Sequence, residues 1–348
     1  MRTLYLIRHG RPVNGDAHTC SYSEDVPLDS VGEQQARNLG DWARTVSLCA
    51  VFSSPLTRCV QTAQHLGAPV RTIEALHEVD TGLWTGLSFQ EISARFPEEY
   101  AQRGRHLGTT APPGGESFAQ AGARMARAIA PLLEQTEGDL AIVAHGGINR
   151  GWLCRLLERD PDEVMSLPQP WGGISAVSIS PEGRYAVQWV GRMPERQPNP
   201  LLLEALLQRY PPPEGVLAHG EAVARQALEL AERTEQPVDR RLLHTACLLH
   251  DLVRDRPNHP QACGELLAQE GYPELGAIVS LHHDLPQGAG PEASLLYLAD
   301  KLVRGVERVT LAQRFEAARR KCTAPEAIAA WETRYRRARE IAAEFHLE

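Results

Sequence analysis

Several segments in the first half of the chain place histidine, arginine or glutamate at the end of a short apolar run or at the start of a helix. A histidine that follows a parallel strand lies where open α/β sheets bind their ligands. An adjacent arginine forks onto phosphate oxygens, and a helix N-terminus also attracts anions. These residue types predict chemistry on a phosphorylated ligand. The segments are Arg8-His9-Gly10, Ser54-Pro55-Leu56-Thr57-Arg58, the stretch around Glu78, and His145-Gly146-Gly147.

The second half of the chain carries a different set, in which histidines and aspartates are spread over expected helices. Imidazole and carboxylate together suit Mn, Fe, Mg or Zn with coordination positions left open to water. Such a metal makes water a nucleophile at neutral pH, and two metals hold both the attacking and the leaving oxygen. The set therefore predicts a metal centre. Its members are His219, His250, Asp251, His259, His282, His283 and Asp300.

The first half alternates expected strands with expected helices. Strands are expected over residues 3–8, 49–53, 69–73 and 140–144, and helices over 31–45 and 116–135. Ser30 and Glu33 have the spacing of a capping box, and Ser54-Pro55 is typical of a helix start. Two alternating segments, 174–180 and 185–190, are separated by a turn sequence and predict a hairpin. This order predicts an α/β domain with a largely parallel sheet and a late antiparallel hairpin.

The pattern changes at the polar, proline-rich segment 194–200, which we interpret as a linker. Beyond it, strand signals almost vanish and helical periodicity dominates. Helices are expected over residues 201–208, 220–234, 239–253, 261–269, 275–281, 293–304 and 324–345. We therefore expect an α/β domain over 1–193 and an all-α domain over 201–348. The length of each lies within the range of about 100–200 residues that is typical of a domain.

The ordered motifs of the first half closely resemble those of the histidine phosphatase superfamily, the phosphoglycerate-mutase-like proteins, over about residues 1–193. The resemblance implies a three-layer α/β fold and hydrolysis of a phosphomonoester through a phosphohistidine on His9. It implies that Arg8, Arg58 and His145 hold the phosphoryl oxygens. Glu78 would protonate the leaving group and then deprotonate the attacking water.

The resemblance also extends to the substrate and to the type of member. Substrate contacts are expected from Gly10, Asn14 and Gly146, and no metal is implied for this half. Arg11 stands where many members carry glutamate, and segment 14–20 lacks the arginine-containing stretch of the mutases. The mutases' longer insertion is also missing. These departures favour a phosphatase, most similar to the short α-ribazole-phosphatase type, over a mutase.

The second set resembles that of the HD-domain phosphohydrolases over about residues 201–310. Under this resemblance the core ligands are His219, His250, Asp251 and Asp300, and the further histidines of two-metal members are His259, His282 and His283. Arg254 stands where many members carry lysine, and arginine binds phosphate but is a poor proton donor. His244 is expected to pack against its neighbours without binding metal.

The composition limits the partners and the location. A net charge of −8 argues against general binding to nucleic acid or to an anionic membrane surface. No apolar run approaches the ~20 residues of a membrane helix. The seven cysteines include no Cys-x-x-Cys pair, which favours reduced thiols and a cytoplasmic location. A small phosphorylated molecule, a phosphomonoester or a nucleotide, is the expected partner.

Three functional interpretations remain open at this point. In the first, the protein is bifunctional, with a metal-independent phosphatase centre and a metal-dependent phosphohydrolase centre. In the second, only the first half is catalytic and the HD domain is a regulatory ligand-binding module. In the third, the HD domain hydrolyses a nucleotide and the first half only binds. The complete set of predicted catalytic residues in the first half weighs against the third.

Overall fold

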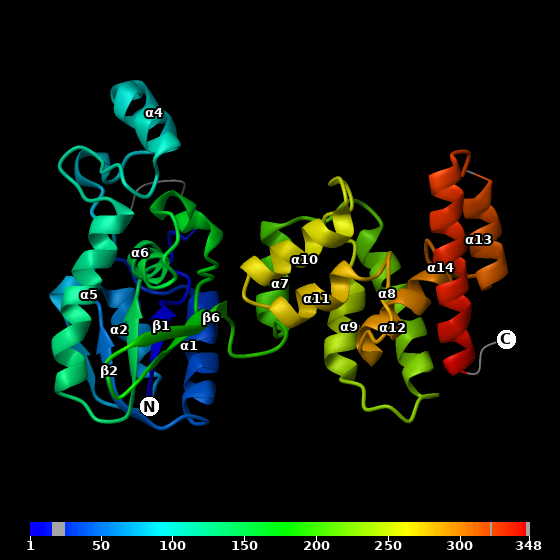
Figure 1. Cartoon of the computed structure of the whole chain (residues 1–348), viewed down its shortest axis with the longest axis horizontal. Helices are drawn as coiled ribbons and strands as arrows, with labels where there is room; N and C mark the ends of the chain where they lie inside the picture. Colours follow the sequence, from blue (N-terminus) through cyan, green and yellow to red (C-terminus); the bar gives the residue numbers. More distant parts are fainter. Residues whose placement is uncertain (16–24, 321, 346–348) are drawn as a thin grey trace. The chain divides into compact units, whose positions relative to one another are not determined.

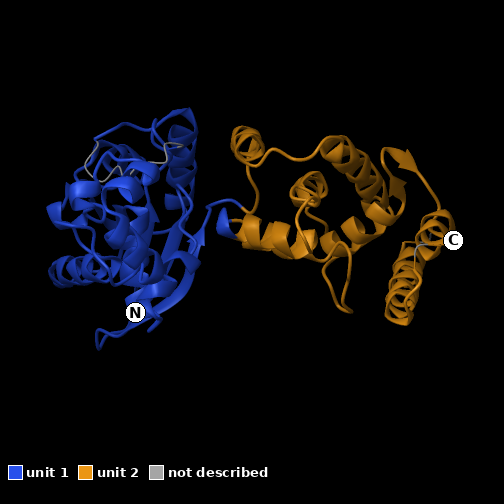
Figure 2. Cartoon of the chain, turned by 90° about the horizontal axis from the view of Figure 1, so that it is seen from above, with its two compact units in different colours: residues 1–195, 269–271 blue, residues 196–268, 272–348 orange. Residues whose placement is uncertain are grey.

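The computed structural model describes residues 1–15, 25–320 and 322–345. Most of segment 14–20, where the sequence lacks mutase-type arginines, lies outside the described residues. The chain divides into two compact units (Figure 2): unit 1 comprises residues 1–195 and 269–271, and unit 2 comprises residues 196–268 and 272–348. The domain limits 1–193 and 201–348, with a linker over 194–200, stay predictions.

Unit 1 is built around a six-stranded sheet in the order β3-β2-β4-β1-β5-β6. The strands are β1 (Arg2–Arg8), β2 (Leu48–Ser53), β3 (Val70–Thr72), β4 (Asp139–Ala144), β5 (Ile174–Ile179) and β6 (Tyr185–Arg192). Strands β3, β2, β4 and β1 pair in parallel, whereas β5 runs antiparallel to both of its neighbours. The predicted largely parallel sheet with a late hairpin is confirmed.

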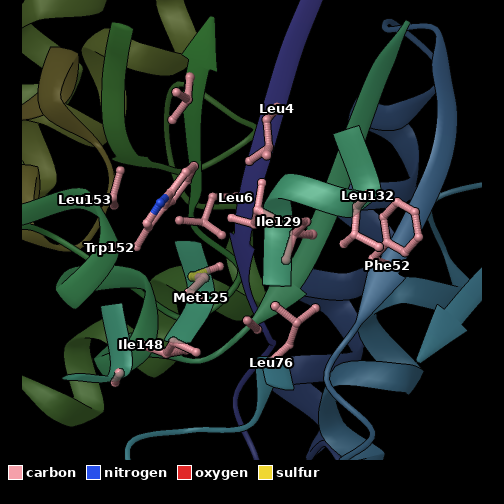
Figure 3. Packing of buried hydrophobic residues seen from close by; sticks show 14 of the residues in the cluster. Leu4, Leu6, Phe52, Leu76, Met125, Ile129, Leu132, Ile148, Trp152 and Leu153 are labelled. Carbon is pink, nitrogen blue, oxygen red and sulfur yellow. The ribbon is translucent and has the colours of Figure 1, made fainter. Parts of the chain in front are cut away.

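Helices cover both faces of this sheet, as Figure 1 shows. They are α1 (Ser30–Ala43), α2 (Thr57–Gln64), α3 (Phe89–Arg95), α4 (Pro97–Arg105), α5 (Phe118–Glu134) and α6 (Gly146–Leu156), with 3-10 helices η1 (Glu74–Leu76), η2 (Gly82–Trp84) and η3 (Pro161–Ser166). One face packs on α5 and α6, where Leu6, Ile129 and Trp152 share a cluster (Figure 3). The other face packs on α1 and α2. The result is the expected three-layer arrangement, since strand side chains alternate between the two faces.

Two helix starts differ from the sequence prediction. Asp29 caps α1 by accepting a hydrogen bond from Gly32 N, so Ser30 is the first helical residue and forms no capping box. Helix α2 begins at Thr57, which leaves Pro55 outside its first turn. In both places the predicted helix start is off by one or two residues. Neighbouring residues have similar capping preferences, so local sequence signals locate a helix end only to within a few residues.

Unit 2 is helical, and seven of its helices overlap the predicted ones, whereas the helix over 311–319 was not predicted and the one predicted over 239–253 ends at residue 249. The helices of unit 2 are α7 (Pro200–Arg209), α8 (Val216–Ala231), α9 (Arg240–Leu249), α10 (His259–Gln269), α11 (Pro273–Ser280), α12 (Pro291–Lys301), α13 (Leu311–Arg319) and α14 (Pro325–Glu344). The last turn of the helix predicted over 293–304 is replaced by a small hairpin of β7 (Val303–Arg304) and β8 (Glu307–Arg308). Gly305, with φ +62°, makes the hairpin turn. Apart from this hairpin, the described part of unit 2 is all-α.

The structure also bears on the predictions about membrane helices and cysteines. Within the described residues, every helix is too short or too polar to cross a membrane. The described cysteines are all free thiols.

Candidate active site and metal centre

The sheet topology gathers the predicted catalytic residues of unit 1. Because β1, β4 and β2 are parallel neighbours, their carboxyl ends meet at one edge of the sheet. His9 follows β1, His145 follows β4, and Arg58 is the second residue of α2, after β2. Glu78 lies in the loop beyond β3. A cleft of about 530 Å³ opens at this edge, and Arg8, His9, Asn14, Arg58 and Glu78 are among the residues that line it.

His9 is held in the form that a nucleophile requires. Its Nδ1 lies 2.7 Å from the carbonyl oxygen of Gly10. A carbonyl only accepts a hydrogen bond, so Nδ1 carries the proton and Nε2 keeps its lone pair. Burial, together with the positive charges of Arg8 and Arg58, lowers the pKa of His9 well below its ordinary value. His9 is therefore neutral near pH 7.

His145 lies beside His9 but does not line the cleft. The two rings are 5.1 Å apart between centroids and nearly perpendicular. The Nε2 atom of His145 is 2.8 Å from Ser54 Oγ. Burial and the neighbouring His9 and Arg58 lower the pKa of His145 well below its ordinary value. The pair is thus two neutral imidazoles among cationic arginines.

Glu78 is fixed at the N-terminus of α6. Its carboxylate accepts hydrogen bonds from the backbone N–H groups of Val79, Gly147 and Ile148, at 2.9–3.0 Å. A Cβ at Gly147 would lie 2.6 Å from Glu78 Oε1, so this position admits only glycine without moving the carboxylate. The carboxylate is therefore anchored by the backbone on the cleft wall.

The remaining substrate contacts predicted for this half divide into two kinds. Asn14 lines the cleft, whereas Gly10 and Gly146 do not. Gly10 instead permits close packing, because a Cβ there would lie 2.6 Å from Gly32 O. A Cβ at Gly146 would lie 3.1 Å from Arg8 Nε. Both glycines shape the loops that carry the site, so direct contact with a substrate remains only a prediction for them.

The structure brings together all the predicted metal ligands of unit 2. They form three overlapping groups in which the ligand atoms lie within 4.8 Å of one another: His219, His250 and Asp300; His250, Asp251 and His282; and His259, His282 and His283. The groups share His250 and His282, which makes one continuous centre. His244 is exposed on α9, so the expectation that it packs inside was wrong. It lies off the buried face of that helix.

Three of these histidines present the same nitrogen to the centre. The Nδ1 atoms of His219, His250 and His282 lie 2.7–2.8 Å from the backbone oxygens of Gly305, Cys247 and Val279 respectively. Each Nδ1 therefore donates a proton to a carbonyl, and each Nε2 is directed into the centre, where that of His219 lies 3.3 Å from Asp300 Oδ1. Such backbone partners orient metal-ligating histidines in proteins.

The ligand atoms are also short of hydrogen bonds. Among the described residues, His250 Nε2, Asp251 Oδ1, His259 Nε2 and His282 Nε2 are buried without a hydrogen-bond partner. His259 Nε2 and Asp251 Oδ1 lie 3.0 Å apart but are not aligned for a hydrogen bond. Leaving such atoms unsatisfied is costly. Divalent metal bound at the overlapping groups would satisfy these atoms, so the residues fit a metal centre.

The two carboxylates of the centre are ionised. Burial raises the pKa of Asp300, but the neighbouring Lys301 and His219 outweigh it and hold that pKa well below its ordinary value. The pKa of Asp251 is also lowered, because its contacts with His282 and His250 outweigh burial. Both side chains are therefore anionic oxygen ligands at neutral pH.

Comparison with known proteins identifies both halves. Residues 4–191, more than half of the chain, match the model of the histidine phosphatase superfamily (branch 1). The chain belongs to this superfamily. Residues 216–305 match the model of the HD domain. The suspected fusion of a histidine phosphatase domain with an HD domain is thereby confirmed.

Two of the proteins similar to the histidine phosphatase domain are phosphatases whose names include a phosphorylated substrate or its alcohol. The 6-phosphofructo-2-kinase/fructose-2,6-bisphosphatase 1 of Mus musculus is 29% identical over 178 residues, which are 49% of this chain and 36% of the relative. The chain thus matches about a third of the length of such curated relatives. The α-ribazole phosphatase of Shigella flexneri is 26% identical, with a TM-score of 0.50 over 55% of this chain and 96% of that chain. Bacillus stearothermophilus YhfR is 26% identical, with a TM-score of 0.51 over 54% and 96%.

Sequence reasoning missed several residues around both sites. In the histidine phosphatase domain, Trp171 packs its ring 5.0 Å from the guanidinium of Arg8, and Arg150 lines the cleft near Glu78. The available signal for Trp171 was its place between two prolines and two glycines, in a segment without helical or strand periodicity. In the HD domain, Lys301 Nζ lies 2.7 Å from Asp300 Oδ2 and donates to His282 O. Its position next to Asp300 was the signal there.

Proposed function

We propose that the histidine phosphatase domain hydrolyses phosphomonoesters through a phosphohistidine on His9. The observation that carries this is the fixed tautomer of His9, which leaves Nε2 unprotonated in a cleft lined by Arg8 and Arg58. A neutral imidazole with a free lone pair, between two guanidinium groups, is placed to attack an anionic phosphoryl group. The family membership supports the same chemistry.

The reaction has two displacements. In the first, His9 Nε2 attacks phosphorus, the N–P bond forms, and the ester P–O bond breaks. Arg8 and Arg58 stabilise the charge on the phosphoryl oxygens, and Glu78 gives its proton to the leaving oxygen. The contact expected between His145 and a phosphoryl oxygen stays a prediction, because His145 lies beside His9 without lining the cleft. In the second, water attacks the phosphohistidine and gives a proton to Glu78. The N–P bond breaks and inorganic phosphate leaves.

Quenching in alkaline detergent after mixing with a 32P-labelled monoester tests this proposal. Wild type should yield labelled protein whose phosphate is acid-labile and stable in alkali, as a phosphoramidate is. His9→Ala should yield none, while His65→Ala, at the exposed C-cap residue of α2, should label like wild type. Equal labelling of His9→Ala and wild type would overturn the proposed nucleophile.

For the HD domain we propose a metal-dependent phosphohydrolase centre. It is supported by the four buried ligand atoms without a hydrogen-bond partner among the described residues. His219, His250, Asp251 and Asp300 would hold one divalent metal, and His259, His282 and His283 would extend the site toward a second. A divalent metal supplies Lewis acidity, which polarises a phosphoryl oxygen and makes water a better nucleophile. The protein supplies imidazole nitrogens and two carboxylates.

Metal analysis of purified protein tests this centre. Wild type should hold stoichiometric divalent metal and hydrolyse a nucleotide, whereas Asp251→Asn should lose both. Asp255→Asn, at an exposed aspartate on the same turn, is the matched control and should behave like wild type. Stoichiometric metal without nucleotide hydrolysis would instead favour the regulatory interpretation, in which a bound nucleotide changes the monoesterase rate. Protein without metal would contradict both.

A further inference from the structure

The HD centre is surrounded by more positive than negative side chains. Arg254 lies 3.3 Å from Asp251 Oδ2, and Lys301 lies 2.7 Å from Asp300 Oδ2. A third cation, Arg314, lies 3.9 Å from Asp300 Oδ1. Three cations therefore stand against two carboxylates before any metal binds. The nearby Asp284 adds no free negative charge, because Arg334 forms a two-pronged ion pair with it.

The excess of positive charge grows when a metal is present. A divalent cation draws on the same carboxylate oxygens that now face the arginines, and it adds two positive charges. A centre of this kind is stable and functional only with an anion to match it. We propose that Arg254 and Arg314 form a cradle beside the metal ligands that binds a phosphate group, either inorganic phosphate or the phosphate of an ester or nucleotide. This inference rests on the proposed metal centre.

The exposure of the three cations separates their roles. Lys301 is buried, with its side chain 10% exposed, and its Nζ is already engaged by Asp300 and by the backbone of His282. The side chains of Arg254 and Arg314 are 57% and 32% exposed, so both reach solvent while lying next to the centre. A guanidinium is a planar fork that matches phosphate oxygens. The two arginines are the ones placed to bind a ligand from solvent.

Both arginines lie on the side of the centre that contains His250. Its Nε2 is 3.7 Å from Asp251 Oδ2 and 3.7 Å from Asp300 Oδ1. These are the same two oxygens that Arg254 and Arg314 approach. Each arginine therefore approaches a carboxylate oxygen that also faces His250, so an oxyanion bound by either guanidinium would lie close to the metal ligands.

Arg314 comes from a part of the chain beyond residue 305, where the match to the HD domain model ends. Its helix, α13, is capped by Thr310 and Gln313, which form a capping box. The next residue, Phe315, is buried against Trp331 and Tyr335 of α14. Helix α14 is joined in turn to α12, because Tyr297 OH donates to Arg334 O. The α13–α14 pair thus holds Arg314 in place as an added part of the centre.

Relaxation of the 31P signal of inorganic phosphate by Mn²⁺-loaded full-length protein tests the cradle. Mn²⁺ broadens the signal only of phosphate that binds near it, and a Mg²⁺-loaded sample gives the diamagnetic baseline. Wild type should show saturable broadening. Arg314→Gln and Arg254→Gln should each raise the dissociation constant of phosphate about tenfold, the size expected for a lost charge-assisted hydrogen bond, with unchanged Mn²⁺ stoichiometry.

Three control variants separate the possible outcomes. Arg320→Gln removes an exposed arginine of α13 that pairs with Glu316, and it should match wild type. Arg58→Gln alters the phosphatase cleft and should leave the Mn²⁺-dependent effect unchanged. Arg314→Lys should restore part of the affinity. Stoichiometric Mn²⁺ with no broadening, or with equal phosphate affinity in all arginine variants, would overturn the cradle alone. Failure to bind Mn²⁺ would overturn the metal centre and the cradle with it.

Discussion

The phosphatase cleft and the HD centre use the same chemical device for different purposes. In both, buried histidines donate their Nδ1 protons to backbone carbonyls and direct Nε2 into the site. Around His9 the neighbouring charges are the guanidinium groups of Arg8 and Arg58. Around His250 they are the carboxylates of Asp251 and Asp300. Cations beside a free Nε2 suit attack on an anionic phosphoryl group, whereas carboxylates suit a metal.

This contrast shows that the histidine alone does not define the chemistry. The backbone sets the tautomer in both units, because the carbonyl that accepts the Nδ1 proton comes from one to three residues away for His9, His250 and His282. The long-range partners then decide between nucleophile and ligand. Predictions that alter those partners therefore separate the two sites.

The largest effect is expected from removing the proton donor of the phosphatase cleft. Glu78→Gln should lower kcat for an alkyl phosphate by roughly 10²–10⁴-fold, the usual contribution of a general acid–base group. The loss should be much smaller for labelling of His9 by p-nitrophenyl phosphate, because that leaving group needs no proton. Steady-state and burst kinetics on both substrates measure this. Glu74→Gln, at an exposed glutamate, is the control. Equal losses for the two leaving groups would contradict the role of Glu78 as acid.

A smaller effect is expected in the HD centre from its buried lysine. Lys301→Met removes the contacts that orient Asp300 and the backbone of His282. It should weaken metal affinity about 10–100-fold, the usual effect of removing a group that hydrogen-bonds a metal ligand. Competition with a chelating dye measures the affinity. Arg304→Met, at an exposed residue of the adjoining hairpin, should leave it unchanged, and both variants should keep the monoesterase rate. Unaltered metal affinity in Lys301→Met would exclude a positioning role.

A third prediction concerns the seat of Glu78. In Gly147→Ala the new Cβ would lie 2.6 Å from Glu78 Oε1 and 2.7 Å from Val79 Cγ2. We expect the carboxylate to shift and kcat to fall about tenfold, because small misplacements of catalytic groups are costly. Thermal unfolding should change little. Gly104→Ala on α4, where a Cβ has open space, is the matched control. Activity equal to wild type would show that the anchored position of Glu78 is not required.

The smallest effect is expected in the pH dependence of stability. The pKa values of His9 and His145 are lowered in the folded protein, so the unfolded chain takes up protons first as the pH falls. Stability from these groups is therefore complete above pH 6.5 and is lost progressively below it. Thermal unfolding followed by tryptophan fluorescence reports mainly unit 1, which holds five of the six tryptophans. His145→Gln should flatten the decline between pH 7 and 5. An unchanged dependence of the unfolding temperature on pH in His145→Gln would contradict a lowered pKa of His145 as a cause of the decline.

The sequence was sufficient for features that depend on local pattern. The period of apolar residues located most helices and strands, and ordered motifs located His9, Arg58 and His145 at the ends of strands that a parallel sheet brings together. It also singled out the set from His219 to Asp300, which the structure brings together and whose role as metal ligands stays a prediction. These signals are short-range or ordered along the chain.

Contacts across long stretches of chain were not predictable in this way. Trp171 meets Arg8 only because the loop before β5 returns to the end of β1. Arg314 meets Asp300 only because Phe315 packs on α14. The β7–β8 hairpin, whose Gly305 carbonyl orients His219, has strands of two residues, too short for a strand pattern. Each depends on packing between elements, which a single sequence does not encode as a local signal.

The central claim is that the two centres are chemically independent, one without and one with a metal. The most direct test is monoester hydrolysis by one preparation before and after its metal is removed with EDTA, with metal content measured in the same samples. The rate should be unchanged after the metal is gone, and nucleotide hydrolysis should disappear. A monoesterase rate that falls with the metal and returns when metal is restored would contradict the account, because it would move that chemistry to the HD centre.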